Sequence, residues 1–245
     1  MLSVIIITKN EAHNIGKTLQ SLQGLSDDIV IVDSGSTDDT IAICKKFDAT
    51  IIETTWDGYG ANKNKGISAA KHEWVLSLDA DESLDQTIKQ EILNIRPQDE
   101  HTVYKLRFQN FFCEKRIRFG VWASDYHIRL FNRTKVRWNT TEVHETLTFP
   151  ADVKILLLKG NVLHYTVSSI SDYTSKMINY AKLSAEKYHQ QGKKAGFLKL
   201  YISPLKMICR FRWLSFIGWW PAARRLAWYA SRLAIAWVSC SSEVQ

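Results

Sequence analysis

Cysteine is scarce in this sequence, and the few cysteines are scattered. Only four of the 245 residues are cysteines, and none of them is spaced as CxxC or as a zinc site. Structural zinc sites and disulfide frameworks usually show regular cysteine spacing. The sequence therefore argues against both, and it favours reduced thiols in the cytoplasm.

Long apolar runs are missing as well. The apolar stretch near the N-terminus covers only seven residues, and residues 213–223 form the longest uncharged stretch of the C-terminal part. A membrane-spanning helix needs about 20 apolar residues, so we expect neither a span nor a secretory signal. The sequence contains no internal repeat or low-complexity linker, and 245 residues can bury one large core with a small appendage.

Apolar strand-like segments alternate with helical patterns through the first third of the chain. Residues 2–8, 29–32, 49–53 and 75–78 are rich in Ile, Val and Leu, and a short helical pattern at 38–47 separates two of them. This alternation is typical of βαβ units and a parallel sheet. The near-continuous apolar runs indicate strands that are buried on both faces.

The most informative stretch is the strand-like segment 75–78, which ends in Asp79, Asp81 and Glu82. In open α/β sheets, ligands bind outside the carboxyl ends of the strands. Paired Asp oxygens there suit Mg²⁺ or Mn²⁺, usually shared with the phosphates of a substrate. The alternative is a helix N-terminus, because Asp and Glu are favoured before an apolar helical segment such as residues 84–93.

Two other predicted strands deliver polar residues to the same edge of the sheet. Residues 8–11 follow the first strand, and Asp33 ends the second. The convergence of three polar strand ends is harder to explain by structure alone than any one of them, so we expect a ligand site at this edge.

These residues resemble a known family, the family 2 glycosyltransferases, which have the GT-A nucleotide-sugar-binding fold. The matching segments follow the family's order and approximate spacing, and they are residues 3–11, 31–38, 60–66 and 78–82. Shorter matches resemble a subgroup of lipopolysaccharide inner-core enzymes, the heptose β-1,4-glucosyltransferases, at residues 129–133 and 143–145. The resemblance implies an α/β GT-A fold with a mixed central sheet and a C-terminal helical region.

The resemblance also implies roles in binding the donor. Asp81 would coordinate the Mg²⁺ or Mn²⁺ ion, which neutralises charge on the departing UDP, and Asp79 would approach the ribose hydroxyls or the metal through water. Asp33 would lie against the uracil ring, unless it only caps the turn that follows it. Further uridine contacts are expected from Thr8, Asn10 and Glu11, although Glu11 could be a plain first-turn acid of a helix.

Lys63 and Asn64 precede the strand that ends in Asp79-Ala80-Asp81, which we call the DxD motif. In the family this region leans over the diphosphate, where a lysine supplies a point charge. The alternative is a solvated helix face, since Lys65 and Lys71 are nearby.

An inverting transfer needs a carboxylate base on the acceptor side of the sugar. Glu145 follows His144 and is our first choice for this base, with Glu142 in reserve. His144 could be a metal ligand or a donor to the diphosphate. The alternative is that the two acids are solvated loop charges and that the histidine is structural.

Arg129 and Arg133 lie in a predicted strand at residues 126–133, where alternation places both on one face. Two guanidinium groups on one face suit a phosphorylated acceptor, although exposed strand arginines are common. Residues 171–191 have the periodicity of an amphipathic packing helix.

Acidic residues are absent from residues 187–242, which hold ten Lys and Arg and five of the nine tryptophans. Basic residues interleaved with Trp, Leu and Ile predict a helix lying in the membrane interface, attracted by anionic lipid. Packed basic helices that cap the sheet are an alternative. Nucleic-acid binding is another, which we do not expect beside a nucleotide-sugar site.

We therefore predict a GT-A catalytic domain at residues 1–168 and a membrane-associating helical region at residues 169–245. The predicted reaction transfers a sugar, with glucose as first choice, from a UDP-sugar to a heptose of a lipid-linked inner core. The enzyme would be peripheral on the cytoplasmic face of the inner membrane. Alternatives are another lipid-linked or polysaccharide acceptor, a non-catalytic membrane-surface module and a sugar nucleotidyltransferase, which normally has a Gly-rich loop after its first strand; this chain has no glycine before Gly16.

Overall fold

A computed structural model describes residues 1–95, 99–118, 123, 125–139 and 146–167, and scattered positions between 169 and 192. The chain divides into two compact units. The first unit comprises residues 1–111 and 124–166, and the second comprises residues 112–123 and 167–245. All of the site described below belongs to the first unit. The predicted membrane-associating region, residues 169–245, lies almost entirely outside the described residues.

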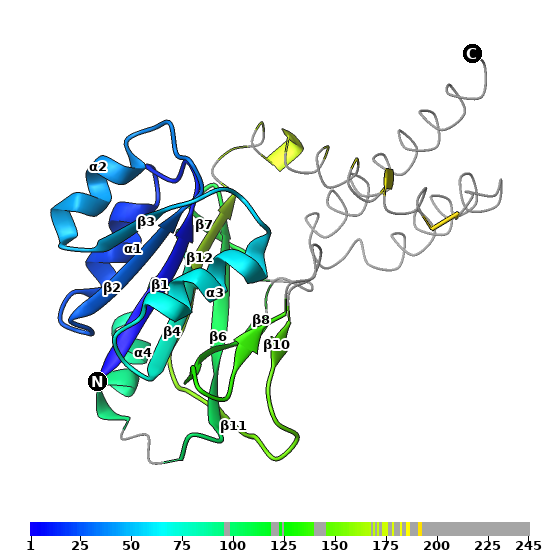
Figure 1. The fold of residues 1–245 in the computed structure, drawn as a ribbon. Coiled ribbons are helices and arrows are strands. Elements are labelled where there is room, and N and C mark those ends of the chain that lie inside the picture. The colour runs from blue at the N-terminus through cyan, green and yellow to red at the C-terminus, as the bar shows by residue number, and fades with distance from the viewer. Residues whose placement is uncertain are drawn as a thin grey trace. The chain divides into compact units, whose positions relative to one another are not determined.

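A mixed ten-stranded sheet forms the centre of the first unit (Figure 1), which holds all of its strands except the two-residue strand Lys115–Arg116. Its strands run in the order β3-β2-β1-β4-β8-β6-β12-β5, and β7 and β11 pair with β6 outside this path. Strands β3, β2, β1 and β4 pair with one another in the parallel direction, and β8 pairs with β4 in the antiparallel direction. The strands of this sheet are β1 (Leu2–Thr8), β2 (Asp28–Asp33), β3 (Thr50–Glu53), β4 (Trp74–Asp79), β5 (Glu82–Leu84), β6 (Thr102–Phe112), β7 (Lys115–Arg116), β8 (Asp125–Asn132), β11 (Lys154–Leu157) and β12 (Val162–Val167).

A separate two-stranded hairpin consists of β9 (Arg137–Trp138) and β10 (Leu147–Thr148). The helices of the first unit are α1 (Ile15–Leu22), α2 (Thr40–Cys44), the 3₁₀ helix η1 (Lys45–Phe47), α3 (Tyr59–Ala69) and α4 (Gln86–Asn94). The predicted alternation of parallel strands and helices is therefore confirmed for the first four strands, and the mixed α/β fold class is confirmed for the unit.

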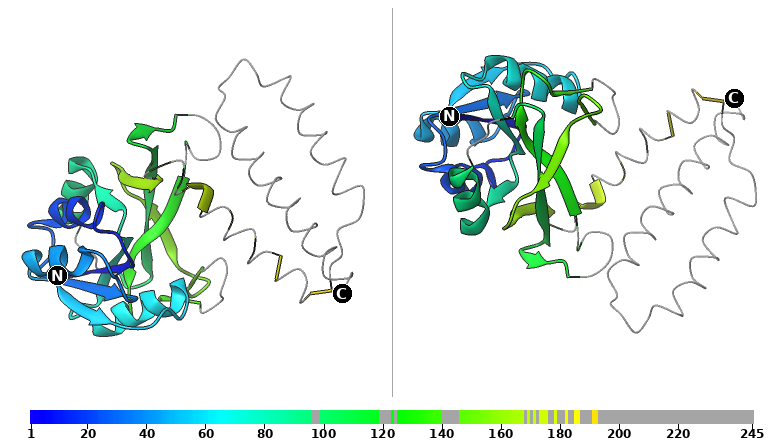
Figure 2. Two further views of the ribbon diagram at one scale, coloured as in Figure 1. Left: turned by 90° about the horizontal axis from the view of Figure 1, so that it is seen from above. Right: turned by 90° about the horizontal axis from the view of Figure 1, so that it is seen from below.

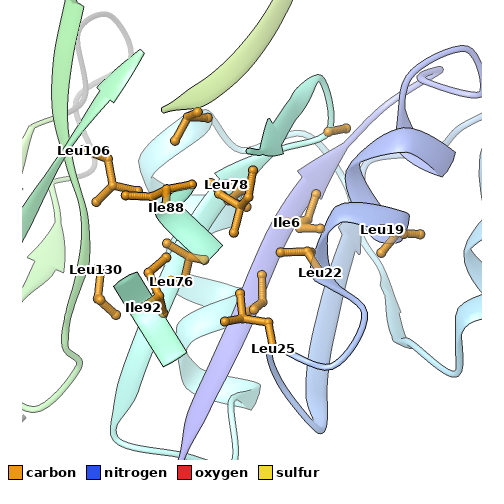
Figure 3. Close-up of a cluster of buried hydrophobic side chains, with 14 of the residues drawn as sticks. Ile6, Leu19, Leu22, Leu25, Leu76, Leu78, Ile88, Ile92, Leu106 and Leu130 are labelled. Carbon is orange, nitrogen blue, oxygen red and sulfur yellow. The ribbon is translucent and has the colours of Figure 1, made fainter. Parts of the chain in front are cut away.

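Alternating side chains of the parallel strands build two cores, one on each face of the sheet. Val4 and Ile6 of β1 point to the face covered by α1 and α4, whereas Ile5 and Ile7 point to the face covered by α3. Figure 2 shows helices on both sides of these strands, and Figure 3 shows the first core, in which Leu19 of α1 lies near Ile6. Burial on both faces explains why these strands are apolar along their whole length.

Helix α3 approaches the sheet closely because Gly66 has no side chain. A Cβ atom at this position would lie 3.1 Å from Cγ2 of Val32 and 3.2 Å from Cβ of Ile5. Such distances are tighter than ordinary van der Waals contact, so a larger residue would push the helix outward. The close packing fixes the distance from the sheet of Lys63 and Asn64, which precede Gly66 in the same helix.

The region after the DxD motif differs from the helical alternative considered for it. Glu82 begins β5, which pairs with β12, and helix α4 starts only at Gln86. The cap of α4 is Asp85, whose carboxylate accepts a 2.8 Å hydrogen bond from the backbone N–H of Ile88. Asp79 and Asp81 are therefore not first-turn acids of α4.

The predicted helix at residues 38–47 is shorter and partly 3₁₀, because α2 covers five residues before η1 begins. Helix ends commonly tighten in this way. None of the helices that the structure describes combines the length and the apolar composition that a bilayer crossing requires.

Candidate active site

Parallel pairing brings three polar strand ends to one edge of the sheet. Thr8 of β1 is in register with Asp33 of β2, and Ile7 is in register with Asp79 of β4. The convergence predicted for this edge is therefore confirmed. It places the residues after β1, β2 and β4 where α/β sheets bind their ligands.

The loops after β1 and β2 are cross-linked by hydrogen bonds. The side chain of Asn10 accepts a 2.7 Å bond from the backbone N–H of Thr37, and the backbone N–H of Asn10 donates to the hydroxyl of Ser36 at 2.8 Å. Asn10 has a φ of 55°, in the left-handed region that Asn tolerates better than most residues. These bonds hold the two loops in one fixed arrangement.

Asp33 is buried, and its carboxylate organises the turn that follows it. One oxygen accepts bonds from the backbone N–H groups of Gly35 and Ser36, at 2.9 and 2.8 Å. The capping alternative considered for Asp33 is thus confirmed. The contact of Asp33 with uracil stays a prediction. The turn already holds the side chain that would make this contact in a fixed position.

Glu11 does not lie in the first turn of α1, which begins at Ile15 after Asn14. Its carboxylate accepts a 2.9 Å bond from the side-chain amide of Asn14, and its backbone N–H donates to the hydroxyl of Thr40. Thr8, by contrast, has a buried hydroxyl without a hydrogen-bond partner among the described residues. The uridine contacts predicted for both residues remain predictions.

Two positively charged side chains hold Asp79 at the end of β4. Nζ of Lys63 lies 3.1 Å from one carboxylate oxygen, and Nη2 of Arg129 lies 3.2 Å from the other. Burial alone would raise the pKa of Asp79, but the charges of Lys63 and Arg129 outweigh it and hold the pKa well below its usual range. Asp79 is therefore ionised and has both oxygens engaged.

Glu82 is the fourth charged side chain of the cluster that Asp79, Lys63 and Arg129 form. Its side chain is 1% exposed; one oxygen lies 2.6 Å from Nη2 of Arg129 and the other accepts a 3.0 Å bond from the backbone N–H of Asp79. Burial raises the pKa of Glu82, Arg129 opposes this effect, and the charge of Asp79 adds to it. Glu82 thus fixes both the backbone of Asp79 and the guanidinium group that pairs with its side chain.

Lys63 belongs to the buried interior rather than to a solvated helix face. It is 1% exposed, and its Nζ lies 4.5 Å from the centre of the Trp138 ring as well as beside Asp79. The solvated alternative for Lys63 is therefore wrong. Asn64 points to the same hairpin, where its amide exchanges hydrogen bonds of 2.8 and 3.1 Å with the backbone of Trp138.

Asp81 faces a histidine that the sequence had not suggested. Its Oδ2 lies 3.4 Å from Nε2 of His164 on β12, and its side chain is 17% exposed. Nδ1 of His164 lies 2.8 Å from the side-chain oxygen of Asn110 on β6, which fixes the ring. Burial lowers the pKa of His164, but the charge of Asp81 and its hydrogen bond outweigh burial and raise that pKa to about 9.

The donor set at this edge fits a cation that takes most of its ligands from substrate and water. Among the described residues, no group of three or more His, Cys, Asp and Glu side chains could hold a metal ion. Asp79 is the more exposed of the two, at 28% against 17% for Asp81, but both of its oxygens already face Lys63 and Arg129, whereas only one oxygen of Asp81 faces His164. Mg²⁺ is commonly held by one or two carboxylates and phosphate oxygens, so Asp81 is the better candidate.

The family is established by comparison with known proteins. A family model described as glycosyl transferase family 2 matches residues 3–151. The chain belongs to this family. Sequence relatives include the uncharacterized glycosyltransferase RT0209 of Rickettsia typhi, which is 32% identical over 209 residues, covering 81% of this chain and 72% of the relative.

Another relative of this glycosyltransferase is the lipopolysaccharide core biosynthesis glycosyltransferase LpsC of Rhizobium meliloti. It is 28% identical over 214 residues, which cover 83% of this chain and 77% of LpsC. Among solved structures, TarS of S. aureus has a TM-score of 0.46 and 19% identity over 74% of this chain. The chain spans only 39% of that TarS chain. A shorter TarS chain, solved with UDP-GlcNAc, has a TM-score of 0.39 and 27% identity over 45% of this chain and 35% of the TarS chain.

A further similar structure is glucosyl-3-phosphoglycerate synthase from Mycobacterium tuberculosis, solved with Mn²⁺, UDP and glucosyl-3-phosphoglycerate. Its TM-score is 0.37 and its identity 20%, over 46% of this chain and 44% of that one.

The two predicted acceptor-binding arginines occupy different surroundings. The guanidinium group of Arg129 is buried between carboxylates, while Arg133 follows β8 and donates a 3.2 Å hydrogen bond to the carbonyl of Ile67. Binding of an acceptor phosphate by these residues stays a prediction. The contacts of Arg129 with Asp79 and Glu82 show that it holds the DxD motif in place.

The predicted catalytic segment lies outside the described residues. Glu142, His144 and Glu145 all fall within residues 140–145, which connect β9 to β10 in the sequence. Their roles as base and metal ligand therefore stay predictions. The described ends of this connection are Asn139 and Thr146, whose side chains hydrogen-bond to each other at 2.7 Å.

The sequence did not predict the contacts that Glu82 and His164 make with the DxD motif. Glu82 is the third acid at the end of the strand-like segment, but the helical alternative for residues 84–93 gave no indication that residues 82–84 form strand β5. No local pattern around His164 identifies it, because its position beside Asp81 depends on the pairing of β12 with β5.

Proposed function

We propose that this glycosyltransferase transfers a sugar, with inversion, from a UDP-sugar to a heptose of a lipopolysaccharide inner core. The observation that carries the proposal is the arrangement at the end of β4. Lys63 and Arg129 hold Asp79, and Asp81 turns toward His164 at the edge where β1 and β2 also end. That edge offers both anchored polar loops for a nucleoside and a partly exposed carboxylate for a diphosphate-bound cation.

A bound Mg²⁺ or Mn²⁺ ion would supply charge neutralisation for the departing diphosphate, with Asp81 as its ligand. Lys63 and Arg129 add two fixed positive charges beneath the same site, and they keep Asp79 ionised and immobile. Preorganised charges of this kind stabilise developing charge without the cost of reorganisation.

The transfer itself needs one proton acceptor. The acceptor hydroxyl oxygen forms a bond to the anomeric carbon, the bond from that carbon to the phosphate oxygen breaks, and UDP leaves. Glu145, or in its place Glu142, takes the hydroxyl proton. Attack on the face opposite the leaving UDP inverts the anomeric configuration, which gives a β-linked product from an α-linked UDP-sugar.

The inner-core acceptor is supported by the chain's relatives and by its own motifs. LpsC, which covers most of this chain, is named for lipopolysaccharide core biosynthesis. Residues 129–133 and 143–145 match the heptose glucosyltransferase subgroup, and the basic, Trp-rich residues 187–242 suit an enzyme that works at a membrane surface. The proposed location is the cytoplasmic face of the inner membrane.

A transfer assay tests this function. The purified chain is incubated with UDP-glucose, Mn²⁺ and a heptose-containing oligosaccharide from delipidated inner core, and the product is examined by mass spectrometry and NMR. We expect one added hexose with a β-linkage to heptose. If UDP-glucose is consumed and the sugar is transferred to another glycan but not to heptose, the proposed acceptor is wrong. Failure to bind UDP or to consume any UDP-sugar would contradict the whole proposal.

A further inference from the structure

Two aromatic side chains stand exposed beside each other at the edge of the candidate site. Trp56 is 45% exposed and Tyr59 is 37% exposed, and their rings meet edge to face with centroids 4.7 Å apart. Among the large apolar side chains that are exposed in the described part of the chain, these two are the aromatic ones. Exposed aromatic pairs lose the stabilisation that burial would give them, and such patches commonly mark ligand sites.

The backbone that carries this pair is firmly held. The backbone N–H of Thr54 donates a 2.9 Å bond to the carbonyl of Asp33, and Nζ of Lys65 donates to both the hydroxyl of Thr54 and the carboxylate of Asp57. Thr55 also donates to Asp57. The exposure of the two rings is therefore a property of a fixed loop, which suits a preorganised binding surface.

The loop lies at the ligand edge of the sheet, because it follows the carboxyl end of β3, which is parallel to β2. In Figure 1 it is the cyan connection between β3 and α3. Its start is bonded to Asp33, on the side where we place the nucleoside. Its end is Tyr59, the first residue of α3.

The end of the loop is fastened to the hairpin that carries the candidate base. A Cβ atom on Gly60 would lie 1.9 Å from the carbonyl oxygen of Asn139, so the helix touches the hairpin backbone directly. Asn64 adds two hydrogen bonds to the backbone of Trp138. Asn139 directly precedes residues 140–145 in the sequence, and these include Glu142 and Glu145.

We propose that Trp56 and Tyr59 form the surface on which the sugar ring of the acceptor stacks. The inference rests on the proposed function, and it adds a binding site for the acceptor to that function. A pyranose ring presents a face of C–H bonds that packs against an aromatic ring, while its hydroxyl groups remain free for hydrogen bonds. Tyr59 adjoins the hairpin with the candidate base, and a base must contact the acceptor hydroxyl.

The position of the pair favours the acceptor over the uracil ring. The nucleoside side of the edge is the polar network of Asn10, Asp33, Ser36 and Thr37, which links the loops after β1 and β2. Trp56 contacts Tyr59 at the start of α3, beside β9. An acceptor stacked there would have one edge directed to the donor sugar and the other to solvent.

The test separates donor binding from acceptor binding in the full chain. Trp56→Ala, Trp56→Phe and Tyr59→Ala are compared with wild type in three measurements: UDP affinity with Mn²⁺, UDP-glucose hydrolysis without acceptor, and transfer to methyl glycosides of heptose, glucose and galactose. Ile155→Ala serves as the control, since Ile155 is another exposed apolar side chain, on β11.

We expect Trp56→Ala and Tyr59→Ala to raise the KM for the glycoside acceptor about tenfold, a change of about 1.4 kcal/mol. UDP affinity and hydrolysis should stay within about twofold of wild type. Trp56→Phe should retain most of the acceptor affinity, and Ile155→Ala should change nothing.

Weaker UDP binding with an unchanged acceptor KM would overturn the inference, because the pair would then belong to the nucleoside. Unchanged values in all assays would also overturn it, as would a wild type that hydrolyses UDP-glucose but responds to none of the glycosides by transfer or by Trp fluorescence. A wild type that neither binds UDP nor hydrolyses UDP-glucose would instead contradict the proposed function itself.

Discussion

Nη2 of Arg129 lies 2.6 Å from Oε1 of Glu82, and both side chains are buried. The same nitrogen lies 3.2 Å from Asp79, so one guanidinium group joins strand β8 to the first residue of the DxD motif and to Glu82, the residue that follows the motif. The motif is therefore not a mobile loop with free carboxylates. It is a turn whose first Asp is fixed from below by a buried ion pair.

Replacing Arg129 should destabilise the fold strongly. Arg129→Met leaves Glu82 buried without its partner, and breaking such a buried pair costs about 3–5 kcal/mol. Urea unfolding of wild type and variant measures this loss. Arg107→Met is the matched control, because Arg107 is exposed on β6, and surface substitutions usually change stability by less than about 0.5 kcal/mol. Equal stability of the two variants would show that the pair does not hold the motif.

Cys44 should be an unreactive thiol in the native protein. Burial, with a smaller effect from the charge of Asp33, raises the pKa of Cys44 from 9.0 to about 11. Since the thiolate is the nucleophile, alkylation at pH 8 should be at least about tenfold slower at Cys44 than at the partly exposed Cys113. Peptide mass spectrometry after timed iodoacetamide treatment gives both rates in one sample, and faster labelling of Cys44 would contradict its burial.

The same shift predicts a pH dependence of stability. The folded state keeps the Cys44 proton at pH values where the unfolded state loses it, so the stabilisation is complete below about pH 9 and declines as the pH rises toward about 11. Between pH 8 and pH 10.5, the free energy of unfolding should decrease more in wild type than in Cys44→Ala. Parallel declines would rule out a contribution from this thiol.

The assignment of the base can be tested within residues 140–145. If Glu145 accepts the acceptor proton, Glu145→Gln should keep the affinity for UDP while losing roughly 10²–10⁴ in transfer rate. Glu142→Gln is its control, with the same change of charge three positions earlier. Should the two profiles be exchanged, Glu142 is the base.

If residues 187–242 attach the chain to a membrane, as we propose, binding to vesicles should respond to salt. Each Lys or Arg close to an anionic surface contributes about 1 kcal/mol, and the attraction is screened as salt is added. Sedimentation of the full chain with vesicles should therefore increase with anionic lipid and weaken with salt, while the tryptophans add a salt-resistant part. Equal sedimentation with neutral and anionic vesicles would instead favour helices that only pack on the protein.

Much of the fold follows from local patterns in the sequence. The run from Val4 to Ile7 is apolar at every position because each face of β1 meets helices, and this alone indicates a buried parallel strand. Asp79 and Asp81 could likewise be placed at a strand end, since the change from apolar to acidic residues is abrupt. The helical alternative failed because Asp85, further along, caps α4.

The contacts around the DxD motif could not be predicted in this way. Arg129 and Glu82 are 47 positions apart, and His164 reaches Asp81 from a strand whose neighbours are set by the antiparallel half of the sheet. Short-range periodicity carries no information about such pairing. For the same reason the alternative of an exposed strand arginine is wrong for Arg129, which lies in a buried cluster.

The central claim is that the end of β4 binds the diphosphate of a UDP-sugar through a cation held by Asp81. Calorimetric titration of the full chain with UDP, in Mn²⁺ and again in excess chelator, tests it most directly, with Asp81→Asn beside wild type. We predict clear binding by wild type in Mn²⁺, and its loss both in chelator and in the variant. UDP affinity that is the same in all three conditions would contradict the account.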